Sequence, residues 1–161
     1  MKPETAARVP PGAVFLVLLV ALVTVAPGCS QQLSVEQQVI AVIRDMEARL
    51  EAVERRPFMN HVAPDFNAQD GRMNREQFNA MVLYYIHRYK RLSARLLPIQ
   101  VEAGEGDTAT ARFRVLFTGG ENWMPDAGRV YQVESRWRME DGEWLLAAAR
   151  WEALELENVL E

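Results

Sequence analysis

The stretch from Tyr131 to Trp151, YQVESRWRMEDGEWLLAAARW, decides the fold of this chain. Alternate positions are apolar on both sides of Asp141-Gly142, and a two-residue period is typical of strands with one buried face. Asp-Gly between two such runs is a strong signal for a two-residue hairpin turn. The stretch therefore predicts a long antiparallel hairpin, with an inward face made by Tyr131, Val133, Ser135, Trp137 and Met139, then by Leu145, Ala147, Ala149 and Trp151.

Two earlier segments have the same period. Residues 97–103 alternate, a Gly-rich turn over 104–107 follows, and residues 109–117 alternate again, with Phe117 on the apolar side. A Gly- and Pro-containing loop over 119–128 then leads into the hairpin. The second half of the chain therefore predicts three or four long antiparallel strands.

The first half has the 3.6-residue period of helices. Ser34 and Asn74 each precede a Gln by three residues, which is the pattern of a helix-starting capping box. The apolar spacing predicts helices over 35–54, 57–63 and from 74 to about 92. Helices followed by antiparallel strands indicate an α+β domain.

The N-terminus has the features of an export signal. Lys2 and Arg8 precede an uncharged run over 13–25, whose length of about 20 Å as a helix is short of a ~30 Å hydrocarbon core. The end of this segment, Ala26-Pro27-Gly28-Cys29, resembles the lipobox of bacterial lipoproteins. That resemblance implies a signal peptide over 1–28 and a diacylglycerol on Cys29.

The lipobox resemblance also implies a location and a domain layout. Ser30, where an Asp commonly retains such proteins in the inner membrane, favours the outer membrane of a bacterial cell envelope, facing the periplasm. We expect a tether over 29–33, one domain over 34–154 and an acidic tail over 155–161. Ordinary signal cleavage leaving a free thiol, or an uncleaved anchor, are the alternatives.

Composition excludes several classes of function. The 161 residues include a single Cys, so neither a disulfide framework within the chain nor a Cys-based zinc site is expected. With only two His residues, far apart, we predict no metal and no other cofactor. Without residues 1–28 the chain has 133 residues with 16 basic and 21 acidic side chains, a formal charge of −5. That charge argues against nucleic-acid binding.

Residues 33–154 resemble the nuclear transport factor 2-like (cystatin-like) superfamily. The resemblance rests on the long first helix, Ala63-Pro64-Asp65-Phe66, the Asp70-Gly71 turn into a capped helix, and the Trp137–Trp144 hairpin with Trp151 beyond it. It implies a cone-shaped, curved antiparallel sheet wrapped around about three helices, often with a pocket at the wide end and often dimeric. The superfamily includes ketosteroid isomerases, SnoaL-type polyketide cyclases and dehydratases, beside non-catalytic binding domains.

The resemblance implies one candidate for a general base. Counting from Asp65-Phe66, the base of the isomerases falls on Asp70, which shares the parity of Phe66 and is expected to point inward. A carboxylate in an apolar pocket has the raised pKa that such a base needs. The alternative is that Asp70 only turns the chain. The other two acidic positions of that pattern fall near Met46 and Ser135, so oxyanion stabilisation is missing.

The two histidines are weaker candidates. His61, beside the short second helix, and His87, on the polar side of the third, are candidates for a dehydratase-type base acting with Asp70 or Asp65. The alternative is that both are surface or hydrogen-bonded structural residues, and this is the interpretation we favour.

Inward-facing aromatic residues indicate a pocket. By parity and helical spacing the expected lining is Tyr85, Phe117, Tyr131, Trp137 and Trp151. Several arginines share the outer sheet face, which predicts a solvated surface or a homodimer interface. The leading hypothesis is a lipid-anchored, non-catalytic domain that binds a small apolar ligand or a protein partner. The alternative is an isomerase or dehydratase with Asp70 as base.

Overall fold

The computed structural model describes residues 33–89, 91–120 and 127–154. Three helices, α2 (Val35–Glu51), α3 (Arg55–Asn60) and α4 (Arg75–Arg88), occur within them. The strands are β1 (Val62–Ala68), β2 (Met73–Asn74), β3 (Arg91–Leu96), β4 (Gln100–Ala103), β5 (Thr108–Gly120), β6 (Ala127–Glu140) and β7 (Glu143–Leu154). Residues 1–28, the tether up to Gln32 and the tail over 155–161 lie outside the described residues.

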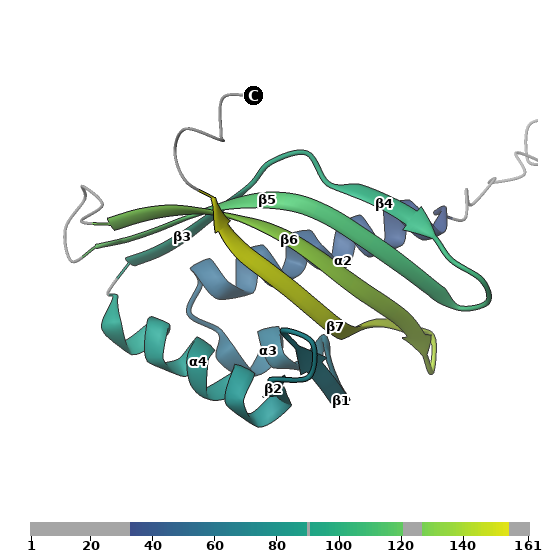
Figure 1. The fold of residues 1–161 in the computed structure, drawn as a ribbon, viewed down its shortest axis with the longest axis horizontal. Helices are drawn as coiled ribbons and strands as arrows, with labels where there is room; N and C mark the ends of the chain where they lie inside the picture. The colour runs from purple at the N-terminus through teal and green to yellow at the C-terminus, as the bar shows by residue number, and fades with distance from the viewer. Residues whose placement is uncertain (1–32, 90, 121–126, 155–161) are drawn as a thin grey trace, which may run out of the picture. The chain divides into compact units, whose positions relative to one another are not determined.

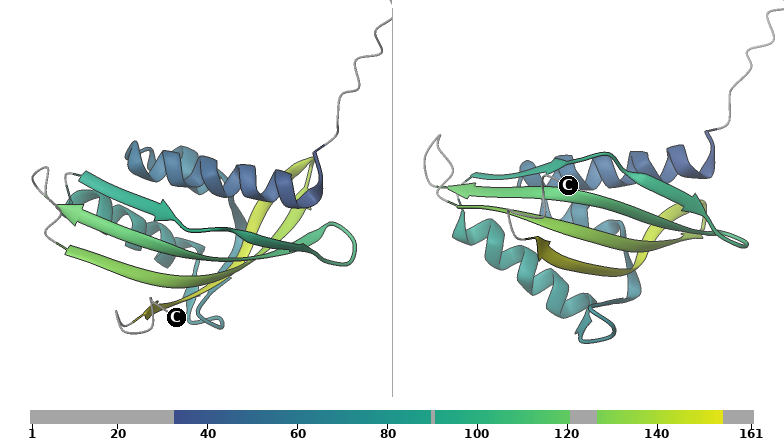
Figure 2. Two further views of the ribbon diagram at one scale, coloured as in Figure 1. Left: turned by 90° about the horizontal axis from the view of Figure 1, so that it is seen from above. Right: turned by 45° about the horizontal axis from the view of Figure 1, so that its top comes forward.

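All seven strands of the described residues belong to one curved sheet that bends around the helices (Figures 1 and 2). The strand order is β2-β1-β7-β6-β5-β3, and β4 pairs with β5 beyond the end of β3. The predicted α+β class is confirmed. One pairing differs from the wholly antiparallel sheet we expected: β1 runs parallel to β7. Parallel strands need a long connection, and α4 and the later strands supply it here.

The first and third helices begin as predicted. The first ends at Glu51 rather than at residue 54, and the second spans Arg55–Asn60 rather than 57–63, since Val62 and Ala63 belong to β1. Ser34 and Asn74 both form complete capping boxes with Gln37 and Gln77. The third helix ends at Arg88, earlier than expected, and the predicted helical residue Leu92 belongs to β3. The strand predicted over 97–103 is also interrupted, because Pro98 lacks an amide hydrogen for the ladder.

The hairpin forms at Asp141-Gly142, where both residues have positive φ, 50° and 85°, as a type I′ turn requires. The inward face of β6 is as predicted. In the first half of β7 the predicted inward residues are wrong. Trp144 and Leu146 are buried there, rather than Leu145 and Ala147. The reason is a β-bulge, since Arg136 pairs with Ala148 whereas Trp137 pairs with Leu146.

Candidate functional site

A cavity of about 470 Å³ lies between the helices and the concave face of the sheet. Its walls come from the second half of α2, from α3 and α4, and from β3, β5, β6 and β7. The lining is mostly apolar, including Ile43, Met46, Leu50, Phe58, Phe78, Met81, Val82, Phe113, Val115, Phe117, Tyr131, Val133, Trp137, Leu146, Ala149 and Trp151. An apolar concave site with few polar groups is typical of small-molecule binding.

The floor of the cavity is formed by Trp137 and Ser135, each 3% exposed. The Trp137 indole Nε1 donates to Ser135 Oγ at 2.9 Å, and Ser135 Oγ donates to the carbonyl oxygen of Ala111 at 3.3 Å. Buried polar groups are normally paired in this way. The Ser135 hydroxyl at the floor is therefore hydrogen-bonded twice, to Trp137 on the same strand β6 and to Ala111 on β5.

Aromatic contacts organise the wall beside β7. The ring of Phe78 lies 6.0 Å from that of Trp151 and 4.9 Å from that of Phe66, measured between centroids. The Gln69 side chain fixes the backbone of Trp151: its Nε2 donates to the Trp151 carbonyl at 2.9 Å and its Oε1 accepts from the Trp151 amide at 3.3 Å. These two hydrogen bonds join the turn before β2 to β7 at Trp151, which lines the cavity.

The mouth of the cavity has a different character. Tyr85 and Tyr89 stack with centroids 6.4 Å apart, Phe117 and Tyr131 meet edge to face at 6.0 Å, and Arg129 completes the rim. Burial raises the pKa of Tyr85, and neighbouring tyrosines add to that effect, whereas the positive charge of Arg129 opposes it. The Tyr85 hydroxyl therefore remains a protonated hydrogen-bond donor at neutral pH.

All five aromatic residues expected to line a pocket, Tyr85, Phe117, Tyr131, Trp137 and Trp151, line this cavity. The sequence reasoning missed Arg129 and the α2 wall. Arg129 has the same parity as Tyr131, so the signal was available one step earlier along β6. The α2 residues belong to an apolar stripe that does not distinguish a packed core from a cavity wall.

Asp70 does not share the inward direction of Phe66. Its side chain is 68% exposed, its nearest cation is Arg72 at 4.0 Å, and it does not line the cavity. Gln69 and Asp70 both have positive φ, 53° and 58°, so the strand alternation ends before Asp70 is reached. Its observed place is in the turn.

The histidines also lie away from the cavity lining. His61 Nε2 is 2.7 Å from an Asp45 carboxylate oxygen, and His87 Nδ1 is 2.8 Å from the Leu83 carbonyl. Neither is paired with Asp70, and Asp65 instead accepts from Arg138 at 2.9 Å. On the outer sheet face, Arg112 pairs with Glu134 at 2.9 Å. A dimer through that face stays a prediction.

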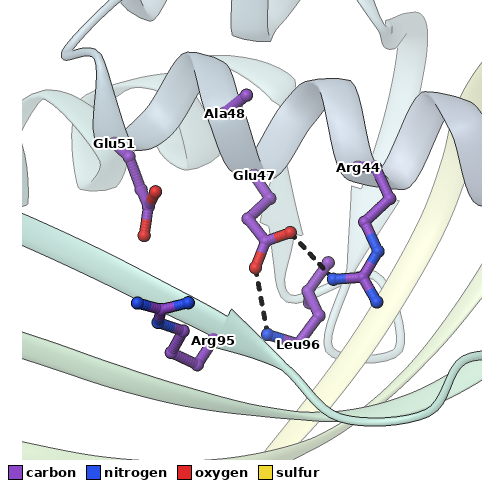
Figure 3. Close-up of a pocket in the computed structure, with 6 residues that line it drawn as sticks. All are labelled: Arg44, Glu47, Ala48, Glu51, Arg95 and Leu96. Carbon is purple, nitrogen blue, oxygen red and sulfur yellow. Dashed lines mark hydrogen bonds and ion pairs between the residues drawn. The ribbon is translucent and has the colours of Figure 1, made fainter.

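A smaller hollow of about 240 Å³ lies between α2 and β3 (Figure 3). Glu47 accepts hydrogen bonds there from the Leu96 amide at 3.0 Å and from Arg44 at 2.9 Å. These two hydrogen bonds connect α2 to the end of β3.

Within the described residues, no group of three or more His, Cys, Asp or Glu side chains could hold a metal ion. In the same part of the chain, no helix has the length and hydropathy needed to cross a membrane.

No family model matches this chain, and no curated protein matches it. Solved structures do. A candidate scytalone dehydratase from Novosphingobium aromaticivorans DSM 12444 is 13% identical, with a TM-score of 0.62, covering 73% of this chain and 83% of that one. A candidate dehydratase of the NTF2-like family from Streptomyces avermitilis is 12% identical, with a TM-score of 0.65 and coverages of 74% and 96%.

A third structure extends over more of the chain. An NTF2-like protein with a cystatin-like fold from Novosphingobium aromaticivorans is 18% identical, with a TM-score of 0.60, and covers 89% of this chain and 88% of that one. Identities this low carry information on fold and not on activity. Together with the curved sheet around three helices, these similarities show that the chain has the NTF2-like, cystatin-like fold.

Proposed function

We propose that this protein binds a small apolar ligand in the cavity enclosed by its sheet and helices. The observation that carries the proposal is a cavity of about 470 Å³ with a predominantly apolar and aromatic lining. Natural interiors are close-packed, so an apolar cavity of this size is larger than an ordinary packing defect. Its volume and its apolar surface are those of small-molecule sites, which measure about 300–1,000 Å³. Binding of an apolar ligand removes the apolar surfaces of the cavity and of the ligand from water, and this stabilises the complex.

Binding is favoured over chemistry by the placement of the carboxylates and histidines. Two of the similar structures are described as candidate dehydratases. A dehydratase needs a proton-transfer group within hydrogen-bonding reach of the reacting atoms. Asp70, His61 and His87 are not among the described residues that line this cavity. The lining carboxylate of Glu47 is already engaged by the Leu96 amide and by Arg44.

The binding test uses N-phenyl-1-naphthylamine, a neutral apolar probe whose fluorescence rises in apolar surroundings. Every core residue lies between Val35 and Trp151, so a chain over 29–161 with Cys29→Ser keeps the whole described core. We expect saturable binding, and we expect Ala149→Phe, which places a ring in the cavity, to abolish it.

The matched control is Ala103→Phe, which adds the same ring on the exposed edge strand β4. This variant should bind the probe like the parent chain. Equal binding by the parent and by Ala149→Phe would place the probe elsewhere on the surface, and the proposal would be wrong.

We further propose that Cys29 carries a lipid that holds the domain at the outer membrane of a bacterial envelope, facing the periplasm. The support is the short uncharged run over 13–25 and the single Cys directly after Gly28. Multiple acyl chains make such anchoring stable. In membrane fractionation of the full-length protein, Cys29→Ser should move the domain to the soluble fraction. Retention of this variant in the membrane would contradict lipid anchoring.

A further inference from the structure

Two charged side chains are found among the described residues that line the cavity, Glu47 and Arg129. The Glu47 carboxylate is neutralised by Arg44, at 2.9 Å, and its other oxygen accepts from the Leu96 amide at 3.0 Å. Within residues 33–89, 91–120 and 127–154, no carboxylate forms an ion pair with Arg129. The charge that the described lining offers to a guest is therefore positive.

The position of Arg129 separates this charge from the apolar floor. Arg129 lies near the start of β6, opposite Phe117 on β5, and is exposed. Tyr85, 39% exposed, marks the same rim, whereas Trp137 at the floor is 3% exposed. A guest that buries its apolar part against Trp137 therefore directs its other end toward Arg129.

The surroundings of Arg129 also favour a negative group. Tyr89, a lining residue at the rim, has a second arginine beside it. The Arg88 guanidinium carbon, at the C-terminal end of α4, lies 5.6 Å from the ring centroid of Tyr89. Tyr85, Tyr89 and Tyr131 add phenolic hydroxyls, which donate hydrogen bonds to anions. Guanidinium and hydroxyl donors beside a half-open apolar site form charge-assisted hydrogen bonds with carboxylates and sulfonates.

We propose, building on the proposed ligand-binding function, that the natural ligand is an apolar molecule with one anionic group. The apolar body occupies the cavity toward Trp137, and the anionic group, a carboxylate or a group of similar charge, binds Arg129 at the mouth.

Two probes with one skeleton test this inference. 1-Anilinonaphthalene-8-sulfonate differs from N-phenyl-1-naphthylamine by its sulfonate, so the pair isolates the contribution of the charge. In fluorescence titrations of the 29–161 chain with Cys29→Ser, Arg129→Gln should weaken sulfonate-probe binding about fivefold, as expected for an exposed ion pair. Binding of the neutral probe should change much less, because that probe has no charge for Arg129 to contact. The difference should shrink as ionic strength rises.

The controls use other substitutions on β6. Arg136→Gln removes an exposed arginine from the same strand outside the cavity lining and should alter neither titration. Arg129→Lys should retain most of the sulfonate preference, and Arg129→Glu should reverse it. If both probes bind and Arg129→Gln affects them equally, the anionic-group inference is overturned and ligand binding stands. If neither probe binds the parent chain, the proposed function itself fails.

Discussion

The Glu47 carboxylate accepts a hydrogen bond from the backbone amide of Leu96 at 3.0 Å (Figure 3). One helical turn later, Glu51 accepts from the amide of Ala94 at 3.1 Å. Four helical residues advance about 6 Å and two strand residues about 6.6 Å, so one face of α2 is in register with the edge of β3. The two carboxylates thereby satisfy amides that this edge strand would otherwise leave unpaired.

Replacing Glu47 should destabilise the domain through this edge. The side chain is 17% exposed, so Glu47→Ala leaves a partly buried amide without an acceptor and should lower the free energy of unfolding by about 1–2 kcal/mol. Glu47→Gln keeps a carbonyl acceptor and should lose less. Urea denaturation of the three proteins measures the difference. Identical midpoints for the parent chain and Glu47→Ala would contradict a stabilising role.

Gly119 is required for the packing of the cavity mouth. A Cβ at this position would lie 2.6–2.9 Å from three ring atoms of Tyr89, closer than such contacts occur. Gly119→Ala should therefore displace the Tyr89 ring, lower the free energy of unfolding by about 1–3 kcal/mol and weaken N-phenyl-1-naphthylamine binding.

Gly128→Ala is the matched control, because Gly128 lines the same cavity and its added Cβ would meet its nearest atom at 3.6 Å, an ordinary contact. This variant should be as stable as the parent chain. If both alanine variants behave alike in denaturation and in the titration, the close approach of Gly119 to Tyr89 has no energetic importance.

Val53 ends α2 in a conformation that suits glycine better. Its φ is 63°, and the bonds from the Glu54 amide to the Arg49 carbonyl, 2.8 Å, and from the Val53 amide to the Leu50 carbonyl, 3.1 Å, form a Schellman motif. A left-handed conformation is unfavourable by about 1–2 kcal/mol for a residue with a Cβ. Val53→Gly should therefore raise the thermal midpoint. Val53→Ala retains a Cβ and should gain less. A lower midpoint for Val53→Gly would contradict this account.

Much of the fold was predictable because its signals are local. The alternation along β5 and β6, the Asp141-Gly142 turn and the two capping boxes each depend on residues within a few positions of one another. The bulge on β7 and the parallel pairing of β1 with β7 were not predictable, since both depend on strands that meet only after the chain has folded.

The site was predictable wherever side chains continue to alternate between the inward and outward faces of a strand. This alternation persists along β6, so Tyr131 and Trp137 were found, and Arg129 was missed because the alternation was followed only from Tyr131 onward. The alternation ends at Gln69, because Gln69 and Asp70 both have positive φ and form a turn. Asp70 was therefore wrongly expected to point inward. Backbone dihedrals of this kind have no clear signature in the sequence when the residue is not glycine.

The hydrogen bond between His61 and Asp45 should make the stability of the domain depend on pH in the acid range. The pKa of Asp45 is lowered, mainly by the hydrogen bond from His61 at 2.7 Å and further by Arg49 at 3.2 Å. The unfolded chain therefore binds a proton to Asp45 at higher pH than the folded chain does. The stabilisation from Asp45 is complete above its unfolded pKa of about 3.9 and is lost as the pH falls through the lower folded value.

Asp45→Asn should accordingly be less stable than the parent chain at neutral pH, and the two should converge as the pH falls through the lowered folded pKa of Asp45. His61→Gln removes the main cause of the shift and should show the same convergence with a smaller difference at neutral pH. Urea denaturation of the three proteins across this range measures both differences directly. A gap between the parent and Asp45→Asn that stays constant down to the lowest pH would mean that the carboxylate charge contributes nothing, and that the asparagine acts only through its altered hydrogen bonding.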